Sequence, residues 1–193
     1  MTSMPSVLQD APEACRLLFR HWDDIRGTAL VPRRSQLDPA KLIPILPVLQ
    51  IVEVQSPGML RCKLVGTGLR NMFGFEFTGR NYLELAPPGG RRIRAFRHWA
   101  GVRRPCGSLF SGGVRYPSGA IAPVVGIGLP LLPDQEDAAG LVLSVTAQVT
   151  ERGWINERSC ETIGMPAHFE FLDIGAGIPD STLPSEDWQM EGK

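Results

Sequence analysis

The hydrophobic and polar positions of this chain change period several times, which predicts a mixture of helices and strands. Residues 13–26 are expected to form an amphipathic helix, because Ala14, Leu18, Trp22 and Ile25 recur at the spacing of one helical face. A proline precedes this stretch and a glycine follows it, as is typical of helix start and stop positions. Short helices are expected after Asp38 and over 69–73, and a longer one over 91–104.

Five stretches have the composition or the alternation of β-strands: residues 49–55, 60–65, 108–116, 121–129 and 140–149. The first two are separated by a Ser-Pro-Gly turn, so they are expected to form an antiparallel hairpin. The last strand has the clearest period, with Leu141, Leu143 and Val145 on one face and Ser144 and Thr146 on the other. The stretch 121–129 carries a proline and two glycines, which predicts an edge strand, a bulge or a close backbone approach.

The order of these elements predicts an α+β fold, in which a five-stranded antiparallel sheet has helices on one face and an N-terminal amphipathic helix. We expect a flexible N-terminus over 1–11, a domain over 12–150 and a C-terminal extension over 151–177. Residues 178–193 are rich in proline, serine and acidic side chains and lack periodic apolar positions, so they are expected to be disordered.

A series of short motifs runs through the first half of the chain in a fixed order. A tryptophan in the first helix is followed by P-x-R-x-x-x-D-P, then L-P, then L-V-G-T, a glycine and T-G-R. The residues that carry this series are Trp22, Pro32, Arg34, Asp38, Pro39, Leu46, Pro47, Leu64, Val65, Gly66, Thr67, Gly74, Thr78, Gly79 and Arg80. Together with the element order, the series resembles a bacterial PAS domain family, the PAS_5 group.

Each motif residue also has a structural interpretation. The glycines permit a positive φ or close packing. Asp38 is suited to capping a helix, with Pro39 at its first position. Arg34 is expected either to pair with a carboxylate that fixes the N-terminal segment or to contact a ligand, with the structural role favoured.

The resemblance implies a stand-alone sensory or protein-interaction module without catalysis. Its sheet would curve around a cavity that holds a small ligand or is filled by packing. The residues expected to line that cavity are Leu64, Phe96, Trp99, Leu143 and Val145. Signals would pass through the N-terminal helix, where Leu18, Trp22 and Ile25 would dock on the chain's own sheet, on a second copy or on a signalling partner.

Composition narrows the class of protein further. Hydrophobic residues make up 43% of the chain, charged residues 21%, and the formal net charge is zero, as is usual for a globular protein. No stretch predicts a membrane span, and residues 1–10 lack the basic and apolar regions of a signal peptide, so we expect a cytoplasmic protein. The four cysteines are too far apart for a zinc knuckle and are expected to be reduced thiols.

Candidate chemistry is sparse. No catalytic motif is present, so the chain is not expected to be an enzyme, although a small enzyme using the same cavity stays an alternative. Haem would need an axial ligand such as His98, but its arginine neighbours favour a solvated surface position. No cysteine has the context of a flavin photosensor, so neither haem nor flavin is required.

Residues 91–104 contain six arginines and no acidic residue, which leaves nucleic-acid binding as a second alternative. The neutral overall charge favours instead a solvated face or a surface for an acidic protein.

Overall fold

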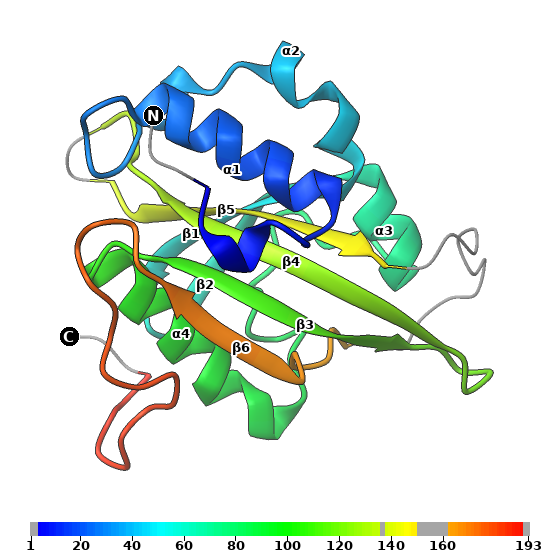
Figure 1. Ribbon diagram of the computed structural model, residues 1–193. Coiled ribbons are helices and arrows are strands. Elements are labelled where there is room, and N and C mark those ends of the chain that lie inside the picture. The colour runs from blue at the N-terminus through cyan, green and yellow to red at the C-terminus, as the bar shows by residue number, and fades with distance from the viewer. Residues whose placement is uncertain (1–3, 136–137, 150–161, 191–193) are drawn as a thin grey trace.

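One six-stranded antiparallel sheet forms the centre of the protein (Figure 1). It is seen in a computed structural model that describes residues 4–135, 138–149 and 162–190. The strands are β1 (Leu49–Ser56), β2 (Met59–Val65), β3 (Gly107–Arg115), β4 (Ile121–Leu131), β5 (Gly140–Gln148) and β6 (His168–Leu172). Their order across the sheet is β2-β1-β5-β4-β3-β6. The predicted antiparallel α+β fold and the hairpin of β1 and β2 are therefore confirmed, and β1 also pairs with β5.

Helices cover both faces of the sheet, whereas the sequence had predicted helices on one face. The helical elements are η1 (Ser6–Leu8), α1 (Glu13–Arg26), η2 (Arg34–Gln36), α2 (Pro39–Leu42), η3 (Ile43–Val48), α3 (Thr67–Phe73), η4 (Pro88–Gly90) and α4 (Arg91–Arg103). Figure 1 shows α1 on one side of the sheet and α4 on the other. No helix in the described part of the chain is both long and apolar enough to cross a membrane.

The apolar face of α1 packs on the sheet of its own chain. Cys15, Leu18 and Trp22 are fully buried there, in one cluster with Leu143 and Val145 of β5. The Trp22 indole N–H also donates to the carbonyl of Pro130 in β4 at 2.8 Å. Of the three surfaces on which Leu18 and Trp22 were expected to dock, the structure shows the chain's own sheet, and not a second copy or a signalling partner, in contact with them. Ile25 is half-buried.

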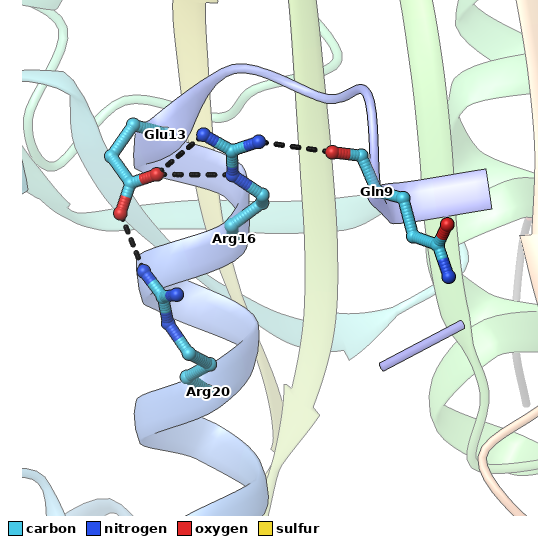
Figure 2. Close-up of polar contacts among 4 residues, drawn as sticks. All are labelled: Gln9, Glu13, Arg16 and Arg20. Atoms are coloured by element: carbon cyan, nitrogen blue, oxygen red, sulfur yellow. Dashed lines mark hydrogen bonds and ion pairs between the residues drawn. The ribbon is translucent and has the colours of Figure 1, made fainter. Parts of the chain in front are cut away.

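The start of α1 is tied to the preceding segment by exposed charges. Figure 2 shows the Glu13 carboxylate between two arginines of the same helix, Arg16 and Arg20. The nitrogen–oxygen distances of these ion pairs are 2.6 Å to Arg16 and 2.5 Å to Arg20. Arg16 also donates to the carbonyl of Gln9 at 2.9 Å. These arginines lower the pKa of Glu13. Because the cluster is solvent-exposed, it orients the segment more than it stabilises the fold.

Strand β4 lies inside the sheet, between β5 and β3, so the predicted edge position is wrong. The proline of the predicted stretch, Pro123, pairs with Gly113 of β3, whereas the pairing of β4 with β5 begins only at Val124, so its missing N–H lies at the end of a ladder. The predicted close approach does occur. A Cβ atom on Gly126 would lie 2.2 Å from the Phe110 ring, so β3 side chains cross over the β4 glycines.

The sheet and its core extend beyond the expected boundaries. β6 forms a sixth strand that pairs with β3, where the pattern had predicted only an extension after residue 150. The segment is short and lies at the edge, so its alternation is brief. At the other end of the chain Leu8 is fully buried, which differs from the flexible segment expected over 1–11.

Residues 178–190 lie along α4, whereas the sequence had predicted a disordered tail. Arg92 of α4 donates to the carbonyls of Ser185, Glu186 and Trp188. The Trp188 ring packs edge-to-face on Phe96, with ring centroids 5.4 Å apart. The physical reason is that α4 supplies the arginine donors and the aromatic surface that the tail itself lacks.

Deleting residues 178–193 is therefore expected to lower the free energy of unfolding by about 2 kcal/mol, since it uncovers Phe96 and removes the Trp188 contact. Thermal unfolding followed by circular dichroism measures this as a loss of several degrees. Trp188→Ala should reproduce much of the loss, whereas Leu183→Ala, at an exposed position, should not. An unchanged midpoint in the deletion would restore the interpretation of a detached tail.

Candidate functional site

A cavity of about 330 Å³ lies between the second face of the sheet and α4. Its apolar lining includes Phe73, Phe110, Val114, Val124, Val142, Ile163, Met165, Pro166 and Phe169. Its polar lining includes Gln50, Tyr82, Arg94, Arg97, His98, Ser108, Arg115, Ser144, Thr146 and Thr162. A mostly apolar enclosure with a few convergent polar groups is the usual form of a small-molecule site.

The sheet contributes small and polar residues to this wall because of strand alternation. Val142, Ser144 and Thr146 of β5 face the cavity, while the residues between them face α1. Ser144 lies opposite Gln50 of β1 on one side and Gly128 of β4 on the other. The missing side chain at Gly128 and the short one at Ser144 leave room above the middle of the sheet.

The helix α4 contributes Arg94, Arg97 and His98, which share one face at spacings of three and four residues. The Arg94 side chain is only 4% exposed. Its guanidinium donates to the carbonyls of Tyr82 at 3.0 Å, Ile163 at 2.6 Å and Gly164 at 3.2 Å. It also lies over the Tyr82 ring, 4.3 Å from the centroid, and burial lowers its pKa. Arg94 thus joins two loops to the helix.

His98 faces the cavity, so the predicted solvated surface position is wrong. Its Nδ1 lies 2.9 Å from the Arg94 carbonyl, and a carbonyl can only accept, so Nδ1 carries the proton and Nε2 is an acceptor. Burial lowers the pKa of His98 to about 4, and the positive charges of Arg94 and Arg97 act in the same direction. At neutral pH the imidazole is therefore uncharged.

Stability is expected to fall as pH drops from about 6.5 towards 4, because the unfolded chain binds a proton at His98 that the folded chain resists. With partial solvent screening the loss amounts to about 2 kcal/mol. The groups around the ring are Arg94, Arg97 and Tyr82. His98→Asn, which keeps a donor for the Arg94 carbonyl, should flatten this part of the pH profile.

Urea unfolding at a series of pH values measures the effect, with His168→Asn as the exposed control. The buried imidazole of His21, whose pKa burial also lowers, adds a decline that both variants retain. Identical slopes for His98→Asn and the wild type between pH 6.5 and 4 would contradict a buried neutral imidazole.

Two further arginines border the cavity. Arg97 donates from Nε to the carbonyl of Thr182 at 3.2 Å, and its guanidinium lies 4.1 Å from the centroid of the Phe169 ring. Arg115 stands at the end of β3 and is exposed. Arg97 therefore contacts the cavity, β6 and the C-terminal segment at the same time.

None of the five residues predicted to line the cavity does so. Leu143 and Val145 are fully buried on the opposite face of the sheet, against α1. Leu64 is exposed on β2, Phe96 packs on Trp188, and Trp99 lies beside Arg103 on another side of α4. The prediction named β5 and α4 correctly but took the wrong face of each, and β2, which carries Leu64, contributes no residue to the described cavity wall. The hydroxyls of Ser144 and Thr146 were the sequence signal that could have indicated the cavity side.

The first motif residues have structural roles. Asp38 accepts from the backbone N–H of Ala40 at 3.0 Å and caps α2, which begins at Pro39. Arg34 is exposed and lies outside the described cavity wall. Its charge helps to lower the pKa of Asp134, where the larger cause is the hydrogen bond from Ser35. These observations favour the structural interpretation of Arg34.

The later motif residues shape turns around α3. Gly66 lies against Pro47, so closely that a Cβ atom would be 2.3 Å from the Leu46 and Pro47 carbonyl oxygens. Thr67 begins α3, and Gly74 ends it with φ 76°. Gly79 has φ 83°, and the Arg80 guanidinium lies 5.9 Å from the centroid of the Phe75 ring.

The arginines of α4 make contacts within the chain, which weakens the nucleic-acid alternative. Arg92 and Arg97 bind carbonyls of the C-terminal segment, and Arg104, just after the helix, donates to the carbonyl of Ile178 at 2.7 Å. Arg94 is buried and Arg103 lies over Trp99. A continuous row of free cations along the helix is therefore not formed.

The buried cysteines are poor nucleophiles. Burial raises the pKa of Cys15 to about 12, of Cys62 to about 11 and of Cys106 to about 12. Their thiols stay protonated near neutral pH, which disfavours thiolate chemistry at these positions. The described residues contain no cluster of three or more histidine, cysteine or acidic side chains that could hold a metal ion.

Comparison with known proteins gives one family match. A family model described as a PAS domain matches residues 11–110.

Three solved structures resemble the fold. The PAS domain of a protein from Colwellia psychrerythraea is 14% identical, with 60% of this chain and 100% of that chain covered and a TM-score of 0.41.

The PAS domain of BvgS from Bordetella pertussis is 14% identical, with coverages of 59% and 87% and a TM-score of 0.42. VqmA of Vibrio cholerae, described as a dimer and a LuxR-type receptor, is 13% identical, with coverages of 60% and 53% and a TM-score of 0.43. No curated protein matches the chain.

Proposed function

Because this chain belongs to the PAS domain family, we propose that it is a non-catalytic sensory module that binds a small molecule in the cavity between the sheet and α4. Members of this family are sensory or interaction modules, and the six-stranded sheet with its covering helices has the PAS fold. The observation that carries the proposal is the cavity itself, which combines an apolar lining with polar groups from several elements.

The contacts of the cavity wall suggest how occupancy would alter the rest of the molecule. Arg94 holds the carbonyls of Tyr82 and Ile163, and Arg97 holds that of Thr182. A ligand that contacted either guanidinium would compete with these carbonyls. Binding would then change the position of the segment before β6 or of the C-terminal segment, which is what a sensor requires.

The first test is to fill the cavity. Ser144→Phe places a ring above the middle of the sheet, between Gln50 and Gly128, and is expected to weaken small-molecule binding by about tenfold or more. Met59→Phe is the matched control, since Met59 is exposed on β2 outside the described cavity wall. The full chain is isolated from cells, and any retained molecule is identified by native mass spectrometry and by the visible absorption spectrum.

Binding is then compared by thermal shift, with the same set of neutral, anionic and cationic small molecules for each protein. A molecule that is retained or that stabilises the wild type and Met59→Phe, but not Ser144→Phe, supports the proposal. Equal stabilisation of all three proteins would place binding elsewhere. If no molecule is retained and none shifts the midpoint, the ligand-binding function is wrong.

A further inference from the structure

The charges around the cavity have one sign. Its described lining contains Arg94, Arg97 and Arg115, whereas no aspartate or glutamate occurs among the described lining residues. His98 adds no charge at neutral pH, because burial lowers its pKa to about 4. The cavity therefore presents fixed positive charge and no compensating carboxylate within its described wall.

Arg94 shows this imbalance most clearly. Its side chain is only 4% exposed; it donates hydrogen bonds to three neutral carbonyls and makes a cation–π contact with the face of Tyr82. Other arginines form ion pairs with glutamate or aspartate, but Arg94 forms none with an acidic side chain in the described part of the chain. A buried cation normally has an anionic partner, because carbonyl dipoles only partly replace the water it has lost.

The remaining lining defines the rest of the ligand. Phe73, Phe110 and Phe169 offer aromatic surface, while Ser144 and Thr146 place hydroxyl groups on the sheet wall. A guanidinium can form two parallel hydrogen bonds, one with each oxygen of a carboxylate. Each carboxylate oxygen can also accept a further hydrogen bond from a hydroxyl group. An apolar body with one carboxylate uses all of these surfaces.

We propose that the cavity binds a small organic anion, in which an aromatic or similarly apolar body carries one carboxylate that pairs with the arginines of α4. This inference rests on the proposed ligand-binding function and names the chemical class of the ligand. Arg94, buried and without a carboxylate partner among the described residues, is its main support. Arg97 is the second cation of the same helix face.

The test compares molecules of matched shape and different charge. Benzoate, phenylacetate and indole-3-acetate are each paired with the corresponding neutral amide, and tryptamine serves as the cationic analogue. Isothermal titration calorimetry of the full chain is expected to show at least one carboxylate binding about 10- to 100-fold more tightly than its amide. Tryptamine is expected to bind more weakly than either member of the indole pair.

Two substitutions assign the preference to the helix. Arg97→Gln is expected to reduce the ratio of carboxylate to amide affinity by about tenfold. Arg103→Gln, on the same helix but exposed and outside the described cavity wall, should leave the ratio unchanged. The ratio is the readout because a merely structural disturbance would weaken both members of a pair. Arg94→Gln should abolish the preference, and if it does not fold, Arg97→Gln and the matched pairs still decide.

The outcomes separate the two proposals. Amides that bind as tightly as their carboxylates, or a carboxylate-to-amide affinity ratio that Arg97→Gln leaves unchanged, overturn the anionic ligand but leave a ligand-binding cavity. The same holds if a neutral or cationic molecule is retained from cells and no carboxylate competes with it. If neither carboxylates nor amides bind and no molecule is retained, both the ligand class and the ligand-binding function are wrong.

Discussion

Replacing Trp22 by alanine is expected to lower the free energy of unfolding by about 3–5 kcal/mol, the usual effect of removing a fully buried tryptophan. The ring fills the space between α1 and the sheet, and its N–H is satisfied by the Pro130 carbonyl at 2.8 Å. The substitution therefore leaves both a cavity and a buried acceptor. Urea unfolding followed by circular dichroism measures the loss.

Trp22→Phe and Trp99→Ala are the controls for this prediction. Trp22→Phe keeps much of the packing but not the donor, so its effect should be intermediate. Trp99 is half-buried beside Arg103, so Trp99→Ala should cost less. Sedimentation velocity tests the alternative that Trp22 anchors a dimer. A Trp22→Ala protein that dissociates from a dimer into a fully stable monomer would show that the ring acts between chains.

Gly66→Ala is expected to destabilise the protein by about 3 kcal/mol or more, although a single methyl group is added. The backbone of Gly66 has φ −64°, which alanine adopts without strain. The obstacle is space, because the new Cβ atom would lie 2.3 Å from the carbonyl oxygens of Leu46 and Pro47. Both are backbone atoms, so η3 or the start of α3 must move away.

Gly89→Ala is the matched control, since Gly89 is exposed and a Cβ atom there would have no neighbour within 4 Å. Its free energy of unfolding should change by less than about 1 kcal/mol in either direction. Chemical unfolding of both variants under one set of conditions gives the comparison. Equal stability of Gly66→Ala and Gly89→Ala would mean that η3 and α3 are not held in contact in solution.

The local pattern of apolar and polar residues was sufficient to predict most of the helices and strands. The alternation of β5 correctly separated its two faces, and the hairpin of β1 and β2 followed from a turn between apolar runs. The Asp38-Pro39 pair predicted the start of α2, and the apolar face of the first helix predicted its burial. These features depend on residues that are close together in the chain, so they can be predicted from the sequence alone.

The position of the cavity was decided by the tertiary structure. Alternation shows that a strand has two faces, but not which one adjoins α1 and which adjoins α4, so Leu143 and Val145 were assigned to the wrong side. The β4 strand is interior because β3 and β5 both pair with it, a fact that its own prolines and glycines obscured.

The arginines of α4 show the same division between sequence and structure. Their number was evident from the sequence, and it suggested a solvated or phosphate-binding face. Arg94 is buried because its carbonyl partners come from Tyr82 and from Ile163, the latter 69 residues away in the chain. Arg92 similarly holds the C-terminal segment, which has too few apolar residues to predict its own docking. The sequence thus determined which side chains were available, and only contacts between distant segments decided which of them would be buried and line the cavity.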